Sequence, residues 1–340
     1  EKERLPVSVS VIDAAEIEAR QATSVAELVV TVPGLTVARS GSPGQVTSLF
    51  SRGTESDHTL VLWNGIKLNN PYFGGYNWAF LPADGVERVE VVRGPFSALY
   101  GSDALGGVVQ VLSGSHQGGT VRLEGGGNGY LRGALAAGMD LGATRIDVTG
   151  HLRRGDGQAP NDFYDSEELM ARAAWALRPG MSLSVVTRVN DSQTGIPFNN
   201  GLPSLQRRIA WREWEVAVPF QVDLGDWSVE AQVSRVAYES AFRDPEDAFG
   251  FTSSDTTSDA VRGRGVASYS LGEDSWLAFG TEVERLEVDD RSVFGVSLDG
   301  ARQQTWALFG ELFYTLGVVR FDLGLRRDEN DVFGGETSPK

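Results

Sequence analysis

The sequence contains no cysteine and only three histidines, and its basic residues are fewer than its acidic ones. The absence of cysteine excludes a disulfide scaffold, a thiolate zinc site and a cysteine nucleophile. The 30 Lys and Arg residues against 46 Asp and Glu residues give a net charge of −16. That balance argues against a nucleic-acid partner, because phosphate binding requires concentrated positive charge.

Long apolar runs are also missing. No run of about 18 or more apolar residues occurs, so the sequence encodes no transmembrane helix, and any membrane-spanning role must fall to β-strands. The chain begins at Glu1 without a methionine, a basic segment or an apolar segment, and we expect any secretion signal to have been removed. His58, His116 and His151 lie far apart in the sequence, and no Ser/His/Asp pattern surrounds them. We therefore do not expect an enzyme.

Residues 1–113 mix helical and strand signals. Asp13 and Ser24 are each followed three residues later by glutamate, which is the spacing of a capping box before a short helix. Asn64-Gly65 between apolar segments predicts a tight β-hairpin. Further strands are expected at 7–11, 86–92 and 108–112. This pattern predicts a compact α+β domain.

From residue 119 to residue 340 the sequence alternates between apolar and polar residues many times. We count about eleven candidate strands of roughly ten residues, which is the length that a bilayer-spanning barrel strand requires. The segment 334–340 resembles a loop leading into another strand. Soluble sandwiches, propellers and β-solenoids alternate in the same way, so the pattern alone leaves these alternatives open.

The number of strands limits the possible barrels. A barrel of about eight strands is filled by its own side chains, and holding a separate domain inside takes about 22 strands. About eleven strands cannot enclose the first domain. Either residues 119–340 are not a barrel, or they cover part of one.

One segment of the first domain carries a family resemblance. Gly85-Val-Glu-Arg-Val-Glu-Val-Val-Arg-Gly-Pro-Phe-Ser-Ala-Leu-Tyr-Gly-Ser-Asp-Ala-Leu-Gly-Gly-Val-Val109 resembles the end of the plug domain of TonB-dependent outer-membrane receptors. Upstream segments in the same order, including Ser51-Arg-Gly53 and Leu60–Leu68, extend the resemblance over about residues 5–113. Within this family, the plug is most similar to that of the cobalamin transporters.

The resemblance implies an α+β plug domain over 1–113, followed by an antiparallel transmembrane β-barrel. Residues 119–340 would supply about 11 of a probable 22 strands, so the chain looks truncated partway through the barrel. The family's TonB box lies ahead of the first plug strand, and residues 1–6 do not contain a convincing one.

The implied function is TonB-dependent, energy-coupled uptake of a scarce nutrient, with cobalamin as the first expectation. The implied partners are TonB with its inner-membrane energising complex, a corrinoid or metal chelate, and outer-membrane lipid, for a monomer in the outer membrane. No cofactor is required. The alternatives are a ferric-siderophore or haem importer of the same family, a non-transporting adhesin or passive pore, and a soluble β-rich hydrolase.

The resemblance also implies site residues. Ligand contacts fall by position on Val46, Ser48, Glu55, Phe73 and Gly74, although Glu55 and Phe73 depart from the expected pattern. The loop 71–78 is rich in aromatic residues, which suits a large flat ligand.

Two further sets of residues follow from the family. Arg52 and Arg93 match plug arginines that pair with barrel glutamates, and the alternative is that both are ordinary surface arginines. Acidic outer loops suggest a calcium site, for which solvated loops are the alternative. The candidate calcium ligands are Asp156, Asp162, Asp165 and Asp191.

Overall fold

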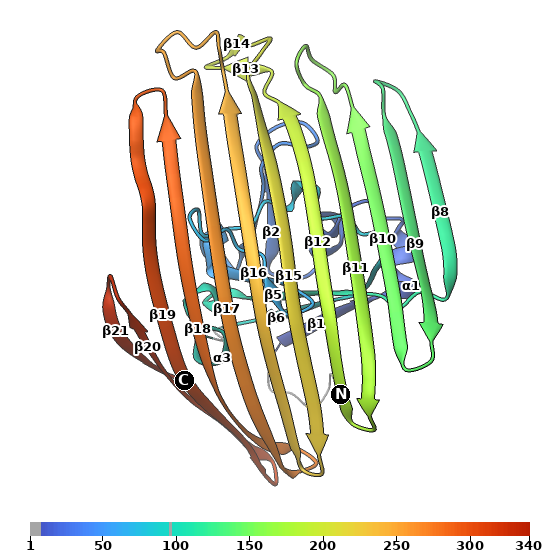
Figure 1. Ribbon diagram of the computed structural model, residues 1–340, viewed down its shortest axis with the longest axis vertical. Coiled ribbons are helices and arrows are strands. Elements are labelled where there is room, and N and C mark those ends of the chain that lie inside the picture. Colours follow the sequence, from blue (N-terminus) through green and yellow to red (C-terminus); the bar gives the residue numbers. More distant parts are fainter. Residues whose placement is uncertain (1–7, 95–96) are drawn as a thin grey trace.

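The computed structural model describes residues 8–94 and 97–340. They form a small mixed domain and one large antiparallel sheet that curves round it (Figure 1). Residues 1–6, where we looked for a TonB box, and the first residue of the strand predicted at 7–11 lie outside the described residues. None of the described helices is both long and apolar enough to cross a membrane.

The small domain, called the plug below, contains a five-stranded sheet in the order β1-β6-β7-β4-β5, in which only β4 and β7 pair in parallel. The strands are β1 (Ser8–Asp13), β4 (Thr59–Trp63), β5 (Ile66–Lys67), β6 (Val86–Arg93) and β7 (Gly107–Ser113). A separate hairpin pairs β2 (Leu35–Arg39) with β3 (Thr47–Ser51). The helices are α1 (Ala14–Arg20), α2 (Val25–Val29) and α3 (Ser97–Tyr100), with short 3-10 turns η1 (Ser56–His58), η2 (Trp78–Phe80) and η3 (Ser102–Ala104).

Local sequence signals account for several of these elements. The Asp13 carboxylate accepts a hydrogen bond from Glu16 N at 3.0 Å and so caps α1 as predicted. Ser24 makes no side-chain cap bond at α2, where instead the Glu27 carboxylate accepts from Thr23 N and Oγ1 at 2.9 and 2.8 Å. The hairpin predicted at Asn64-Gly65 is confirmed, with both residues at positive φ as its two-residue turn requires.

The large sheet, called the wall below, has twelve strands that run antiparallel in sequence order, with β8 and β21 at its edges. Its strands are β8 (Gly118–Gly125), β9 (Leu131–Leu141), β10 (Thr144–Gly155), β11 (Tyr164–Arg178), β12 (Met181–Gly195), β15 (Arg208–Leu224), β16 (Trp227–Arg243), β17 (Ser253–Gly272), β18 (Ser275–Ser292), β19 (Gly295–Leu316), β20 (Val319–Asn330) and β21 (Gly334–Pro339). A small hairpin of β13 (Phe198–Asn199) and β14 (Leu202–Pro203) lies between β12 and β15.

The count of eleven strands is therefore corrected to twelve. The segment expected to be a loop, Gly334–Pro339, pairs with β20 along its whole length. Two adjacent glycines and a proline hide the strand pattern there.

The two ends of the wall differ in their connections. At one end, called the short-turn end, two residues join the strands, as at 142–143, 179–180 and 225–226. At the other, called the long-loop end, the connections include 156–163, 196–207 and 244–252. Outer-membrane barrels have short periplasmic turns and longer extracellular loops, so the resemblance to outer-membrane receptors implies that the long-loop end is the extracellular one.

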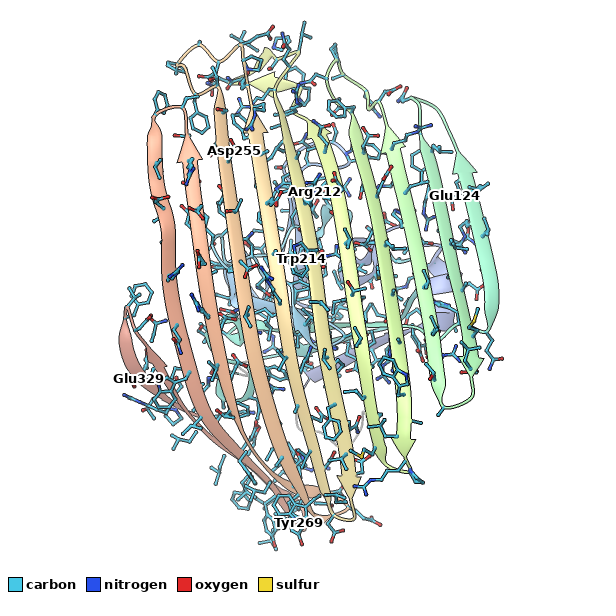
Figure 2. The ribbon with its side chains drawn as sticks, viewed as in Figure 1. Glu124, Arg212, Trp214, Asp255, Tyr269 and Glu329 are labelled. Carbon is cyan, nitrogen blue, oxygen red and sulfur yellow. The ribbon has the colours of Figure 1, made fainter. Side chains whose placement is uncertain are left out.

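The outer face of the wall divides into two bands. Toward the short-turn end it is apolar, with Leu308 and Phe321 at 55% and 44% exposure. Toward the long-loop end it carries ion pairs such as Arg212–Asp191, and Figure 2 shows Arg212 on that half of β15 and Tyr269 at the opposite end of the wall. The wall strands therefore reach 22 residues in β19, beyond the predicted ten, because part of each strand extends past the apolar band.

The inner face of the wall is polar and buried against the plug. Arg188 on β12 and Glu215 on β15 point inward and are 0% and 1% exposed. The residues that alternate with them along each strand, such as Val189, point outward and are apolar or exposed. A sheet of a soluble protein buries apolar side chains and exposes polar ones, and the wall does the reverse. This reversed distribution is typical of a membrane barrel that encloses a domain. It rules against the soluble sandwich and propeller alternatives.

Candidate functional site

The tip of the β2–β3 hairpin, residues 40–46, reaches the long-loop end of the wall. Ser42 Oγ donates to Asp162 Oδ2 at 2.8 Å, and Gln45 Nε2 donates to the Gly195 carbonyl at 2.5 Å. A Cβ on Gly44, which has φ +90°, would lie 2.6 Å from the Tyr164 Cβ. Glycine is therefore required where the hairpin tip presses against the wall.

A cavity of about 530 Å³ opens between this hairpin tip and the loops of the wall. Its size is within the range of small-molecule sites, roughly 300–1,000 Å³. Its lining combines polar side chains, which can form hydrogen bonds with the edge of a flat ligand, with aromatic rings, which can pack against its face. The polar and aromatic lining residues of this outer cavity are Ser40, Ser42, Gln45, Asn128, Tyr130, Gln158, Asp162, Tyr164 and Phe198.

The aromatic-rich loop 71–78 has two parts. Asn70 Oδ1 accepts from the backbone amides of Tyr72 and Phe73, each at 2.8 Å, and this turn leaves both rings exposed with centroids 4.9 Å apart. Tyr76 and Trp78 are instead buried and pack edge to face. Only the first pair of aromatic residues is placed to touch a ligand.

The five predicted ligand residues lie on three neighbouring segments. Val46 is 44% exposed beside the hairpin tip, Phe73 is 60% exposed, and Glu55 is exposed at the start of η1. Ser48 is half-buried in β3, and a Cβ on Gly74 would meet Asp57 Cβ at 2.9 Å.

One hydrogen bond ties these segments together. Thr47 N donates to Asn77 Oδ1 at 3.0 Å, which joins β3 to the aromatic-rich loop. The five predicted residues stay a prediction, and none of them lines the outer cavity. Sequence reasoning missed Ser42 and Gln45, for which the only signal was the glycine and serine content of 40–44.

The predicted latch arginines have partners within the plug. Arg93 donates to the Pro33 carbonyl at 2.7 Å and to Ser10 Oγ at 3.1 Å. Arg52 is exposed in a turn at φ 52°. Across residues 8–94 and 97–340, neither arginine forms an ion pair with a wall glutamate.

A carboxylate of the plug is held by the wall instead. Both oxygens of Asp84 accept from Arg132 Nη2, at 2.8 and 2.7 Å, and Asp84 Oδ2 lies 2.9 Å from His151 Nδ1. The three side chains are at most 8% exposed. Burial acts to raise the pKa of Asp84, but the hydrogen bonds from His151 and Arg132 outweigh it and hold that pKa below 3.8.

A second buried cluster lies further along the wall. Arg188 pairs with Glu168 at 2.6 Å, Glu215 at 2.8 Å and Glu213 at 3.0 Å, and its Nη2 donates to the Tyr76 hydroxyl at 3.4 Å. Burial raises the pKa of Tyr76 well above 10.0, so the hydroxyl stays neutral. In the first cluster the plug supplies the carboxylate and the wall the arginine, whereas in the second the ion pairs lie within the wall and the plug supplies only the Tyr76 hydroxyl.

The four candidate calcium ligands are not gathered. Asp162 is buried and accepts from Ser42 and Gln158, Asp191 pairs with Arg212 on the outer face, and Asp156 and Asp165 are exposed. In the part of the chain that the structure describes, no group of three or more acidic, histidine or cysteine side chains could hold a metal ion. The described side chains therefore do not fit a calcium site, and calcium stays an untested prediction.

Comparison with known proteins relates this geometry to a family. Residues 1–108 match the family described as "TonB-dependent Receptor Plug Domain". Over 104 residues the chain is 47% identical to a vitamin B12 transporter BtuB of Vibrio vulnificus, covering 31% of this chain and 17% of that protein. A second BtuB, from Photobacterium profundum, is 27% identical over 345 residues, covering 96% of this chain and 54% of the relative. The chain thus spans about half the length of this relative.

Solved structures share the fold. A ferric enterobactin receptor, PfeA, superposes with a TM-score of 0.81 at 19% identity, covering 99% of this chain and 60% of that one. The siderophore receptor PirA of Pseudomonas aeruginosa gives 0.73 at 19% identity, covering 98% and 58%. TonB-dependent receptors are outer-membrane transport proteins and not enzymes, in agreement with the sequence-based expectation. Residues 1–108 of the chain thus match the plug domain of TonB-dependent receptors, and the described chain has the fold of such a plug followed by twelve strands of a receptor barrel.

Proposed function

We propose that this chain belongs to a receptor that binds cobalamin at the cell surface and imports it in a TonB-dependent manner. The observation that carries this proposal is the 47% identity of the plug to a vitamin B12 transporter, together with similarity to a second one along 96% of the chain. The siderophore receptors are below 20% identity and support the fold alone.

The geometry suits binding followed by an energised rearrangement. The outer cavity opens at the long-loop end, where a nutrient arrives. Apolar packing joins the plug core to Met170 and Val186 of the wall, and buried polar contacts at Asp84 and Tyr76 also hold the plug to the wall. Such contacts add little net stability but are costly to break singly, so they keep the plug in place until work is done on it.

The order of strands suggests where that work acts. Among the described strands, β1 lies at the edge of the plug sheet and pairs with β6, so a pull applied through the N-terminal residues would separate β1 first. Removing an edge strand breaks one ladder of hydrogen bonds and leaves the remaining four strands paired. TonB with its inner-membrane complex is the proposed source of this pull.

The proposal is tested in cells that lack their own cobalamin receptor and express the complete receptor. We expect saturable binding of radiolabelled cyanocobalamin with or without TonB, and uptake only with TonB. Binding of ferric enterobactin in place of cyanocobalamin would contradict the ligand and favour an iron-chelate importer. Uptake that survives loss of TonB would contradict the mechanism and favour a passive pore.

A further inference from the structure

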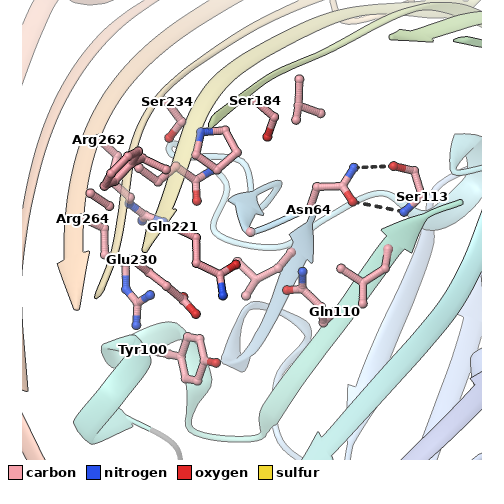
Figure 3. Close-up of a pocket in the computed structure, with 18 of the residues that line it drawn as sticks. Asn64, Tyr100, Gln110, Ser113, Ser184, Gln221, Glu230, Ser234, Arg262 and Arg264 are labelled. Carbon is pink, nitrogen blue, oxygen red and sulfur yellow. Dashed lines mark hydrogen bonds between the residues drawn. The ribbon is translucent and has the colours of Figure 1, made fainter. Parts of the chain in front are cut away.

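A second cavity, called the inner cavity, lies on the other side of the plug. It has a volume of about 610 Å³, is partly open, and lies between the plug strands β4, β6 and β7 and the wall strands β11, β12 and β15 to β18 (Figure 3). Its wall residues include Ser182 at the start of β12 and Gln221 near the end of β15, which places it toward the short-turn end. It shares no lining residue with the outer cavity.

Most of the described polar side chains that line this cavity without a hydrogen-bond partner are neutral amides and hydroxyls. In the described part of the chain, six of them make no side-chain hydrogen bond to another residue, and the amide nitrogen of Gln232 is buried without a partner. Amides and hydroxyls without protein partners must bind water or a ligand, because leaving them unpaired costs about 1–3 kcal/mol each. The six are Gln110 on the plug and Ser182, Ser184, Gln221, Gln232 and Ser234 on the wall.

The charged residues of the cavity give it no positive field. Three arginines and four glutamates line it. Arg262 donates to Glu284 at 2.5 Å, and Arg264 donates to the Leu99 carbonyl at 3.4 Å with its guanidinium 5.3 Å from the Tyr100 ring centroid. Arg262 and Arg264 are thus occupied, which leaves Arg172 as the one lining arginine without a side-chain partner among the described residues, and the four glutamates oppose an anionic chelate.

We propose that the inner cavity is a second binding site, which holds the nutrient as it passes between plug and wall. Its ligand is neutral and rich in amide and hydroxyl groups, the chemistry of the side chains around a corrinoid ring. The polar groups of the ligand replace ordered water on Gln110, Gln221 and Gln232. The ligand and these side chains therefore lose little hydrogen bonding when the ligand enters the cavity. This inference rests on the proposed function, because it places the same substrate class at a later point of its path.

The absence of cysteine from these 340 residues permits a direct test in the complete receptor, with any cysteine outside this chain replaced by serine. In Ser184→Cys the introduced thiol lies in the inner cavity, and in the control Ser268→Cys it lies on the same half of the wall outside the cavity lining. With cyanocobalamin and active TonB, we expect maleimide labelling of the Ser184→Cys thiol to slow about threefold or more, because a bound ligand buries its lining. We expect no slowing for Ser268→Cys, and none for either variant without TonB.

A block of the cavity provides the second readout. In Ser184→Trp and Ser234→Trp an indole occupies the cavity, and the closely packed residues around it cannot move apart to make room for a ligand as well. Uptake should therefore fall about tenfold. Cyanocobalamin binding at the outer face should stay within about twofold of that of the unmodified receptor. Ser268→Trp, which adds the same indole on the same half of the wall but outside the cavity lining, should leave uptake unchanged. Retained outer binding also reports that each variant is folded.

The outcomes separate the two proposals. If the unmodified receptor binds no cyanocobalamin, the proposed function fails. If it binds and imports cyanocobalamin but neither thiol protection nor the tryptophan block is seen, the inner cavity is overturned and the proposed function stands.

Discussion

The plug and the wall distribute their apolar residues in opposite directions. In the plug, Val25, Leu28 and Leu81 are fully buried, as in a soluble domain. In the wall, Leu308 is 55% exposed on the outer face while Arg188 is fully buried on the inner face. The plug is therefore stabilised by its own core, whereas the wall depends on lipid outside and on the plug inside.

The largest expected effect concerns the core of the plug. Trp78→Ala removes a side chain that is 1% exposed and packs against Tyr76, so the free energy of unfolding should fall by about 3–5 kcal/mol. Trp306→Ala is the matched control on the outer face of the wall, where the side chain is 42% exposed and a much smaller loss is expected. Chemical unfolding of the receptor in lipid vesicles measures both. Equal losses would show that the plug has no separate core.

The lipid face of the wall provides the next effect. Leu308→Arg puts a charge between Trp306 and Tyr314 on the exposed face of β19, and should destabilise the folded receptor by about 2–4 kcal/mol. Leu316→Arg, at the short-turn end of the same strand, should cost only about 0–1 kcal/mol. Refolding titrations in vesicles measure the two variants. If Leu308→Arg were neutral, the outer face would not contact lipid.

These contrasts also explain what could be predicted from the sequence. The hairpin at Asn64-Gly65 and the cap at Asp13 depend on residues within a few positions of each other, so local chemistry was sufficient. Alternation along the wall strands likewise needs only neighbouring residues. Signals of this kind indicated the change from mixed elements to repeated strands between residues 113 and 119, whereas the antiparallel order of the wall was implied by the family resemblance.

The contacts between plug and wall could not be predicted in the same way. Asp84 lies 48 residues from Arg132 and 67 from His151, and nothing local indicates that they meet. The family resemblance directed attention to Arg52 and Arg93, whose described contacts remain in the plug. Which charged pairs form depends on how the plug is seated, and that is a property of the packed structure.

The Asp84 contact gives a smaller effect with a defined pH dependence. Asp84→Asn weakens the charged hydrogen bonds to Arg132 and His151 and should reduce the stability of the docked plug by about 1.5–3 kcal/mol. Because the folded-state pKa lies below 3.8, the ionised Asp84 stabilises the native receptor above that pH, and its contribution is lost as the pH falls below it.

Protease protection of the plug from about pH 2 to pH 7 measures this effect. The unmodified receptor should lose protection at the acid end, and Asp84→Asn should be less protected at neutral pH and flatter with pH. Glu16→Gln, which breaks an exposed pair with Arg20, is the control and should change little. An unchanged pH profile in Asp84→Asn would remove Asp84 from the contacts that hold the plug.

The smallest effect concerns the predicted ligand contacts at the plug apices. Phe73→Ala removes a ring that is 60% exposed, and should weaken cyanocobalamin binding by about 1–2 kcal/mol if the ring stacks on the ligand. Glu55→Gln keeps the shape and removes the charge, so its effect should be smaller still. Phe333→Ala, an 82% exposed ring between β20 and β21, is the control and should leave affinity unchanged. Equilibrium binding to whole cells measures all three. Unchanged affinity in both plug variants would leave the hairpin tip and the outer cavity as the ligand site, since Ser42 and Gln45 contact the wall loops there.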